Sequence, residues 1–229
     1  MKRRLLIFDF DGTLADTFGL FVEVFDEAAE LYRFDLFDRH RLEHLRTLDA
    51  ASILKYHRVP FWKLPFIART TRKIMARRIK NIHLFPGMAA VVTSLQRSGF
   101  ILALVTSNSK RNALKVLGPQ LSQCFDHFEC GISMFGKRAA LKRILRRTGF
   151  AASDAMLIGD ELRDIYAAES VNISFGAVGW GYTSIDTLTE AGAHECFALA
   201  TDITSKLAQT NVAQVQCNLQ SSAAHLTSR

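Results

Sequence analysis

The sequence lacks any uninterrupted apolar run of about 18 residues, so it predicts no membrane-spanning helix. Its N-terminal stretch resembles a signal peptide, with Lys2 and Arg3 before an apolar run. However, Asp9 and Asp11 interrupt that run, and no small-residue cleavage site follows. The four cysteines form no CxxC pair, which favours reduced cysteines over a disulfide or zinc framework. We therefore expect a cytoplasmic protein.

The composition lies in the ordinary range of globular proteins. Hydrophobic residues make up 48% and charged residues 22% of the 229 residues, which excludes a wholly disordered chain, a collagen and a disulfide-rich miniprotein. The net charge is +7, from 29 Lys and Arg against 22 Asp and Glu. Such a charge is compatible with nucleic acid, a membrane surface or a small anionic substrate, and composition does not choose among them.

Four short apolar runs each end in polar or glycine residues. Runs of this kind are typical of strands buried on both faces of a parallel sheet. They cover residues 5–8, 100–105, 155–158 and 173–178. Helical patterns separate them, over residues 87–97, 137–148 and 164–170. Because strands and helices alternate, we predict an α/β fold with a doubly wound, Rossmann-like parallel sheet.

One segment, residues 16–84, breaks this alternation. Its apolar residues recur at helical spacing and it contains no convincing strand, so we predict an all-helical domain inserted after the first strand. The α/β core would then comprise residues 1–15 and 85–205. Residues 206–229 are rich in Gln, Ser, Asn and Thr, which predicts a flexible tail.

Polar residues gather where the predicted strands end. The carboxyl ends of parallel strands meet at one edge of the sheet, which is the usual ligand site of such folds. The residues expected there are Asp9, Asp11, Thr13, Thr106, Lys137, Asp160 and Asp164. Four carboxylates near one point repel each other unless a cation neutralises them. The pattern therefore predicts a hard-cation site, suited to Mg²⁺, that faces a phosphate pocket.

These residue types suit phosphoryl transfer. A metal-bound carboxylate can attack phosphorus and form an aspartyl-phosphate. A second carboxylate two residues on, lifted away from the metal by a turn at Gly12, can act as a general acid. A hydroxyl group and a lysine can hold the phosphoryl oxygens while their charge redistributes during the transfer.

The same residues resemble the four motifs of the haloacid dehalogenase (HAD) superfamily of phosphatases. Residues 9–13 read Asp-Phe-Asp-Gly-Thr, similar to that superfamily's DxDGT signature. Thr106 matches the second motif, Lys137 the third, and residues 159–164 the fourth, GDxxxD. The resemblance covers about residues 4–200, and the helical insertion resembles the C1-type cap of the family. In overall pattern the chain is most similar to the phosphoglycolate-phosphatase-like members.

The resemblance implies a role for each site residue. The implied catalytic residues are Asp9, Asp11, Thr106 and Lys137. Asp9 would be the nucleophile and Asp11 the general acid and base, and the other two would bind the phosphoryl group. The implied Mg²⁺ ligands are Asp9, the backbone carbonyl of Asp11, and Asp160. Behind these ligands, Asp164 would orient Lys137 or a metal-bound water. The residues expected near the substrate are Gly12, Thr13, Ser107 and Asn108.

The sequence departs from the family pattern at two positions. Phosphoglycolate-phosphatase-like members often have Asn after the second-motif Thr and Pro after the third-motif Lys, whereas Ser107 and Arg138 stand here. Lys142, about one helical turn after Lys137, is therefore an alternative third-motif lysine. Two other functions stay open: a phosphomutase of the beta-phosphoglucomutase kind, and a non-catalytic binding module that has kept the fold.

Other patterns could suggest different functions. His40 and His44 have the HxxEH spacing of a zinc protease motif, but their charged surroundings favour a solvated helix face. The glycine-rich stretch 176–181 favours a loop beside the active site over a dinucleotide site. In the insertion, Trp62 and Phe66 are expected to pack against the helices. The chain contains no recognised nucleic-acid-binding module, so the expected partner is a small anionic phosphorylated metabolite, with neither nucleic acid nor a membrane.

Overall fold

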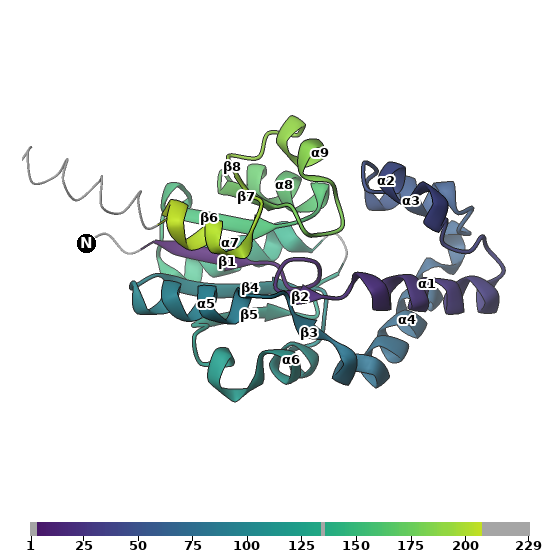
Figure 1. Cartoon of the computed structure of the whole chain (residues 1–229), viewed down its shortest axis with the longest axis horizontal. Coiled ribbons are helices and arrows are strands. Elements are labelled where there is room, and N and C mark those ends of the chain that lie inside the picture. The colour runs from purple at the N-terminus through teal and green to yellow at the C-terminus, as the bar shows by residue number, and fades with distance from the viewer. Residues whose placement is uncertain (1–3, 134–135, 208–229) are drawn as a thin grey trace, which may run out of the picture.

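The computed structural model describes residues 4–133 and 136–207. Its centre is a six-stranded parallel sheet with the strand order β5-β4-β1-β6-β7-β8 (Figure 1). The strands are β1 (Leu5–Phe8), β4 (Ile101–Thr106), β5 (His127–Cys130), β6 (Ala155–Gly159), β7 (Ser174–Val178) and β8 (Glu195–Phe197). The first strand of the chain therefore lies in the middle of the sheet.

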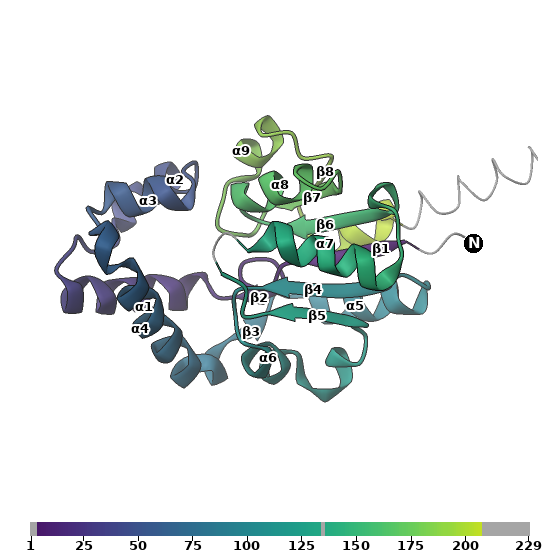
Figure 2. The ribbon, with the colours of Figure 1, turned by 180° about the vertical axis from the view of Figure 1, so that it is seen from behind.

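Helices cover both faces of this sheet. One face carries α5 (Met88–Arg97), α6 (Lys110–Ser122) and a helix over residues 200–207. The other face carries α7 (Lys137–Thr148), α8 (Leu162–Glu169) and α9 (Ile185–Glu190), and the short turn η4 (Ala152–Asp154) leads into β6. Figure 2 shows α7 in front of the sheet, on the side opposite α5. This architecture confirms the predicted doubly wound α/β fold.

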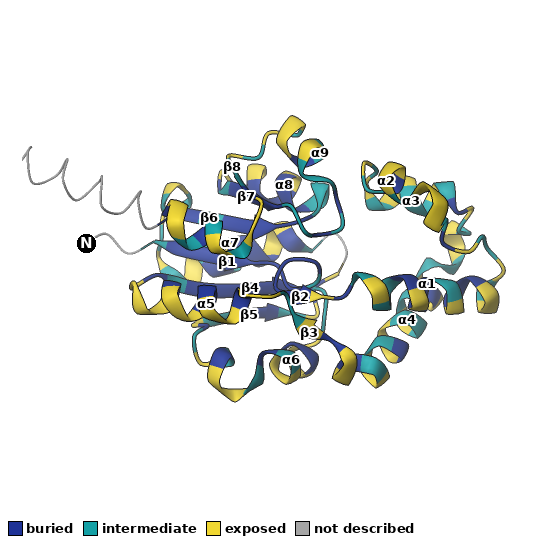
Figure 3. Ribbon diagram, in the orientation of Figure 1, coloured by how far each residue is buried: buried dark blue, intermediate teal, exposed yellow. Residues whose placement is uncertain are grey.

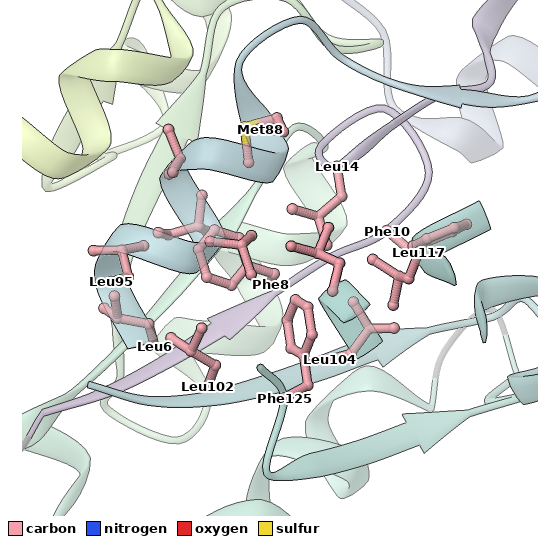
Figure 4. Packing of buried hydrophobic residues seen from close by; sticks show 14 of the residues in the cluster. Leu6, Phe8, Phe10, Leu14, Met88, Leu95, Leu102, Leu104, Leu117 and Phe125 are labelled. Atoms are coloured by element: carbon pink, nitrogen blue, oxygen red, sulfur yellow. The ribbon is translucent and has the colours of Figure 1, made fainter. Parts of the chain in front are cut away.

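The central strands are apolar throughout because both of their faces are covered. In β1, Leu5 and Ile7 belong to the cluster under α7 and α8, whereas Leu6 and Phe8 belong to the cluster under α5 and α6. Successive side chains of a strand point to opposite faces, so burial of both faces requires an unbroken apolar run. Figure 3 shows the buried strands, and Figure 4 shows the second cluster around Phe8.

The segment between β1 and α5 forms a helical layer beside the sheet (Figure 1). The chain leaves and re-enters the core through a short antiparallel pair, β2 (Ala15–Asp16) with β3 (His83–Leu84). Between them lie α1 (Phe18–Tyr32), η1 (Arg39–Arg41), α2 (Leu42–Leu45), α3 (Ala50–Tyr56), η2 (Phe61–Lys63), α4 (Leu64–Arg78) and η3 (Ile79–Asn81). These helices have an apolar cluster of their own, which contains Val22, Phe25, Phe37 and Leu45. The two strands were not expected, since two residues are too few to show alternation.

Two aromatic residues of the insertion differ from expectation. Trp62 is 72% exposed and Phe66 is 60% exposed, so the prediction that they pack against the helices is wrong. The physical reason lies in α4, whose buried positions are Ile67 and Ile74. These two residues are seven positions apart and share one face of the helix, from which the side chain of Phe66 projects away. Trp62 lies before α4, in η2, where the Lys63 ammonium lies 5.0 Å from the centroid of its ring.

The C-terminal part of the core extends beyond β8. Leu207 is buried against the sheet, and the ammonium group of Lys206 donates to the backbone oxygen of Cys196 at 2.7 Å. These two residues of the expected tail thus belong to the helix over residues 200–207, and residues 208–229 lie outside the described residues. Among the residues that the structure describes, no helix is long and apolar enough to cross a membrane.

Candidate active site

Three neighbouring strands bring the predicted site residues to one edge of the sheet. Asp9 follows β1, Thr106 ends β4, and Asp160 follows β6. Because β1 pairs with both β4 and β6, these positions are adjacent, and the backbone N–H of Asp9 still donates to Ile158 O at 2.9 Å. Helix α7 begins at this edge, with Lys137 as its first residue. The shared edge therefore places a lysine among carboxylates that come from different strands.

Lys137 joins two of the carboxylates. Its Nζ lies 2.9 Å from Asp9 Oδ2 and 2.5 Å from Asp164 Oδ1. All three residues are buried. Lys142, the alternative lysine of the sequence pattern, is exposed. The geometry thus places Lys137, and not Lys142, beside Asp9.

Asp160 is held by donors on both of its oxygens. Thr13 Oγ1 donates to Oδ1 at 2.7 Å, and the backbone N–H of Tyr182 donates to Oδ2 at 2.8 Å. Two glycines allow this close packing, because a Cβ at Gly12 or at Gly181 would overlap the Asp160 side chain. Thr13, which was expected near the substrate, therefore contacts a carboxylate in this structure, and the orientation of Asp160 is fixed by its neighbours.

Asp11, two residues after Asp9, is only half-buried. Its oxygens accept hydrogen bonds from Thr106 Oγ1 at 3.5 Å and from Asn108 Nδ2 at 3.4 Å, both near the upper limit for such bonds. The turn that directly follows Asp11 depends on Gly12, whose φ of 78° lies in the left-handed region that glycine favours. Ser107 is half-buried in the loop after β4, next to Asn108.

Burial governs the protonation of these groups. It raises the pKa of Asp9 from 3.8 to about 7, although the charge of Lys137 opposes the rise. Burial also raises the pKa of Asp11, and it raises the pKa of Asp160 together with neighbouring carboxylates. Burial alone would lower the pKa of Lys137, but the charges of Asp164 and Asp9 outweigh it and raise that pKa. The site thus favours a charged lysine and disfavours several simultaneous carboxylate charges.

A divalent cation fits this arrangement. Asp9, Asp160 and Asp164 each offer a carboxylate oxygen, and these oxygens lie within 4.8 Å of one another. Asp164 Oδ2 is buried and has no hydrogen-bond partner in the described part of the chain. Carboxylate oxygens are the ligands that Mg²⁺ prefers, and its charge would offset the cost of ionising buried carboxyls. Asp164 accordingly lies among the possible ligands as well as beside Lys137.

Three residues of the site were not predicted. Glu161 and Arg163, at the start of α8, form an ion pair, and their charges act on Asp9. They occupy variable positions of the GDxxxD pattern, so that pattern carries no signal for them. Tyr182 directly follows the glycine-rich stretch 176–181, which was expected to lie beside the active site. That expectation agrees with the contact between Tyr182 and the Asp160 carboxylate.

The histidines of the HxxEH pattern lie apart from these carboxylates. His40 and His44 are both exposed on the helical insertion. Within residues 4–133 and 136–207, neither histidine belongs to a group of three possible metal ligands. The structure therefore gives no support to a zinc site at this pattern.

The family of the chain follows from its match to a known family model. A model described as haloacid dehalogenase-like hydrolase matches residues 6–178. The chain belongs to the haloacid dehalogenase-like hydrolase family. This match extends from β1 through β7 and includes the whole carboxylate cluster. The predicted family and the prediction of an enzyme are thereby confirmed.

Individual relatives of this hydrolase agree with the family match. It is 29% identical over 187 residues to a phosphoglycolate phosphatase of Synechococcus elongatus, over 81% of this chain and 88% of the relative. A crystal structure described as a predicted phosphatase from Clostridium acetobutylicum has a TM-score of 0.77 at 21% identity, covering 91% of this chain and 100% of that one. CbbY from Rhodobacter sphaeroides, solved in complex with phosphate, has a TM-score of 0.67 at 22% identity, covering 87% and 95%. These two structures share the fold of this hydrolase.

Proposed function

We propose that this hydrolase is a Mg²⁺-dependent phosphatase that cleaves a small phosphomonoester through an aspartyl-phosphate on Asp9. The observation that carries the proposal is the 2.9 Å pairing of Asp9 with Lys137 inside a group of three buried carboxylates. The relative named phosphoglycolate phosphatase supports the same class of substrate. Asp9, the Asp11 backbone carbonyl and Asp160 would hold the Mg²⁺, which supplies positive charge that offsets the carboxylates and the phosphate.

In the first step Asp9 is the nucleophile. One of its carboxylate oxygens attacks the phosphorus, and the bond between phosphorus and the leaving alcohol oxygen breaks. Asp11 donates its proton to that oxygen, so the product leaves as an alcohol. Burial raises the pKa of Asp11, which increases the protonated fraction that this step needs.

In the second step Asp11 changes its role from acid to base. Now ionised, it accepts a proton from a water molecule whose oxygen attacks the phosphorus. The bond from phosphorus to Asp9 breaks, which releases inorganic phosphate and restores the carboxylate. During both steps Lys137, Thr106 and the Asn108 amide hold the phosphoryl oxygens as their charge changes. Asp164 keeps the Lys137 ammonium in place through their ion pair.

The helical insertion, residues 16–84, acts as a cap over this site in our proposal. It is joined to the core by the short β2–β3 pair and contacts the loop after β7 through Arg46. Closure of such a cap excludes water from the first step and admits it again for the second. Exposed basic residues of α4 favour the approach of a small anionic phosphorylated metabolite. They are Arg69, Arg72, Lys73 and Arg77.

The test is phosphate release from p-nitrophenyl phosphate with Mg²⁺ and with a chelator. We expect release that requires the metal and is abolished by Asp9→Asn. Asp186→Asn, at an exposed position in α9, is the matched control and should retain the activity of the natural sequence. Unchanged turnover in Asp9→Asn would overturn the proposed nucleophile. With a sugar phosphate, an isomerised product in place of free phosphate would show a phosphomutase.

A further inference from the structure

We propose that Arg46, in the helical insertion, positions the metal ligand Asp160 through one peptide unit, the unit that joins Gly181 to Tyr182. Arg46 directly follows α2, whereas Asp160 follows the central strand β6. The inference rests on the proposed function in that it takes Asp160 as a Mg²⁺ ligand. Arg46 is a positioning residue in this account, because it acts on the metal site through the backbone of another loop.

The first half of the connection lies between the loop after β7 and Asp160. The N–H of Tyr182 donates to Asp160 Oδ2 at 2.8 Å, and the N–H of Thr183 donates to the Asp160 backbone oxygen at 3.1 Å. The other carboxylate oxygen accepts from Thr13 at 2.7 Å. The Asp160 side chain is completely buried, so these donors determine how its carboxylate is oriented.

The second half of the connection lies between the same loop and the insertion. Arg46 Nη2 donates to Gly181 O at 3.1 Å, and Arg46 Nε donates to Tyr182 O at 3.4 Å. In return, the N–H of Ser184 donates to Arg46 O at 2.9 Å. Both views of the ribbon show this loop extending from β7 toward α2 (Figures 1 and 2). Three hydrogen bonds therefore join one residue of the insertion to the loop that holds Asp160.

The oxygen of Gly181 and the N–H of Tyr182 belong to the same planar peptide unit. In a trans peptide these two groups point in opposite directions and rotate together, and no cis peptide occurs among the described residues. A guanidinium on the oxygen therefore fixes the direction of the N–H that holds Asp160. It also polarises the peptide, which strengthens that N–H as a donor. Gly181 permits the close approach, since a Cβ there would overlap the Asp160 side chain.

The connection makes the metal site depend on the insertion. When α2 moves away from the core, Arg46 leaves the Gly181 oxygen and the peptide is free to rotate. The Asp160 carboxylate then loses one of the two hydrogen bonds that orient it, and the Mg²⁺ affinity falls. By thermodynamic linkage, bound Mg²⁺ must favour the arrangement in which Arg46 contacts the loop.

The test measures Mg²⁺ binding to the metal-free full chain by isothermal titration calorimetry, without substrate. We expect Arg46→Gln to weaken binding about fivefold, less than the roughly 10- to 100-fold typical of residues that contact a ligand directly. Arg46→Lys should recover part of the loss, because it restores the positive charge but not the planar fork with which Nη2 and Nε reach two carbonyls. Arg39→Gln is the control: Arg39 lies on the insertion surface, paired with Asp26, and its loss should leave the Kd unchanged.

Hydrogen exchange supplies a second measurement. In Arg46→Gln the segment 179–184 should exchange faster than in the natural sequence, while the unfolding temperature of the metal-free protein changes little. An unchanged Kd in Arg46→Gln, or an equal loss in Arg39→Gln, would overturn the inference. If Arg46→Gln does not fold, Arg46→Lys takes its place: weaker Mg²⁺ binding than in the natural sequence would support the inference, and an unchanged Kd would overturn it. Calorimetry and hydrogen exchange measure no turnover, so they test this inference separately from the proposed function. If Arg46 affected Mg²⁺ binding as expected but the phosphatase assay found no phosphate release, the proposed function would be contradicted and this inference would stand.

Discussion

Lys137 forms ion pairs with two buried carboxylates, so the effect of its replacement on stability can be predicted. Lys137→Met removes the charge and keeps much of the volume, which leaves Asp9 and Asp164 without their cation. In metal-free protein at about pH 8 we expect the free energy of unfolding to fall by roughly 3–5 kcal/mol. At about pH 5 the loss should be smaller, because Asp9, with a pKa raised to about 7, takes up a proton instead.

Urea unfolding of both proteins at the two pH values measures this difference. Lys142→Met is the matched control, since Lys142 lies on the same helix but is exposed. Its free energy of unfolding should stay within about 0.5 kcal/mol of the natural sequence. A loss at Lys137 that is the same at both pH values would contradict the account of the ion pairs.

The raised pKa of Asp9 also predicts how Mg²⁺ acts at different pH. The pKa of Asp9 is 3.8 in the unfolded state and about 7 in the folded state. At pH values between these two, the folded state binds the Asp9 proton more tightly than the unfolded state does. The metal-free protein therefore loses stability from this group as pH rises through that window. Mg²⁺ binds the ionised form and competes with the proton, so a fixed Mg²⁺ concentration should raise Tm more at about pH 8 than at about pH 5. Differential scanning fluorimetry checks this, and an equal rise at both values would contradict it.

Several site residues were predictable from the sequence because they follow strands. Asp9, Thr106 and Asp160 come directly after or at the end of apolar runs, and parallel strands bring such positions together. Arg46 and Tyr182 follow no such rule. Their contacts depend on how the insertion meets the loop after β7, which is tertiary information that no local pattern contains.

Within individual elements, replacement of two glycines by alanine is expected to change stability in opposite directions. Gly19 lies in α1, and a Cβ at this position would meet no atom within 4 Å. Gly19→Ala should therefore stabilise the protein by about 0.5–1 kcal/mol through helix propensity. Gly12→Ala should destabilise it by more than about 1 kcal/mol, because φ is positive there and the Cβ would overlap Asp160.

Denaturant unfolding with a parallel phosphatase assay measures both variants. Gly19→Ala should retain activity, whereas Gly12→Ala should lose it together with stability. If Gly12→Ala were as stable and as active as the natural sequence, this explanation of the turn after Asp11 would be contradicted.

The predictability of each strand follows its burial. The central strands β1, β4 and β6 are buried on both faces, and their apolar runs were recognised. The edge strands β5 and β8 were not, because they are short and carry polar residues such as Glu129 and Glu195. Edge strands pair with a neighbour on one side only and are less covered, so fewer of their side chains need to be apolar.

For the whole molecule, charge separates into two kinds of environment. The candidate site collects buried carboxylates, whereas much of the excess basic charge lies exposed on the insertion and on α7. In the proposed function, a Mg²⁺ ion together with Lys137 would offset the negative charge of the carboxylates, and the exposed basic residues would attract an anionic substrate. The net charge of +7 is thus consistent with the small anionic phosphorylated metabolite of the proposed function.

If Asp9 carries the phosphoryl group during turnover, as proposed, that group can be trapped on it. Asp11→Asn should still be phosphorylated by p-nitrophenyl phosphate with Mg²⁺, because nitrophenolate leaves without a general acid. It should then hydrolyse slowly, because no base activates water. After an acid quench, we expect mass spectrometry to find one phosphoryl group, mapped to Asp9. Phosphate release with no phosphorylated protein, or with the group on another residue, would contradict the account.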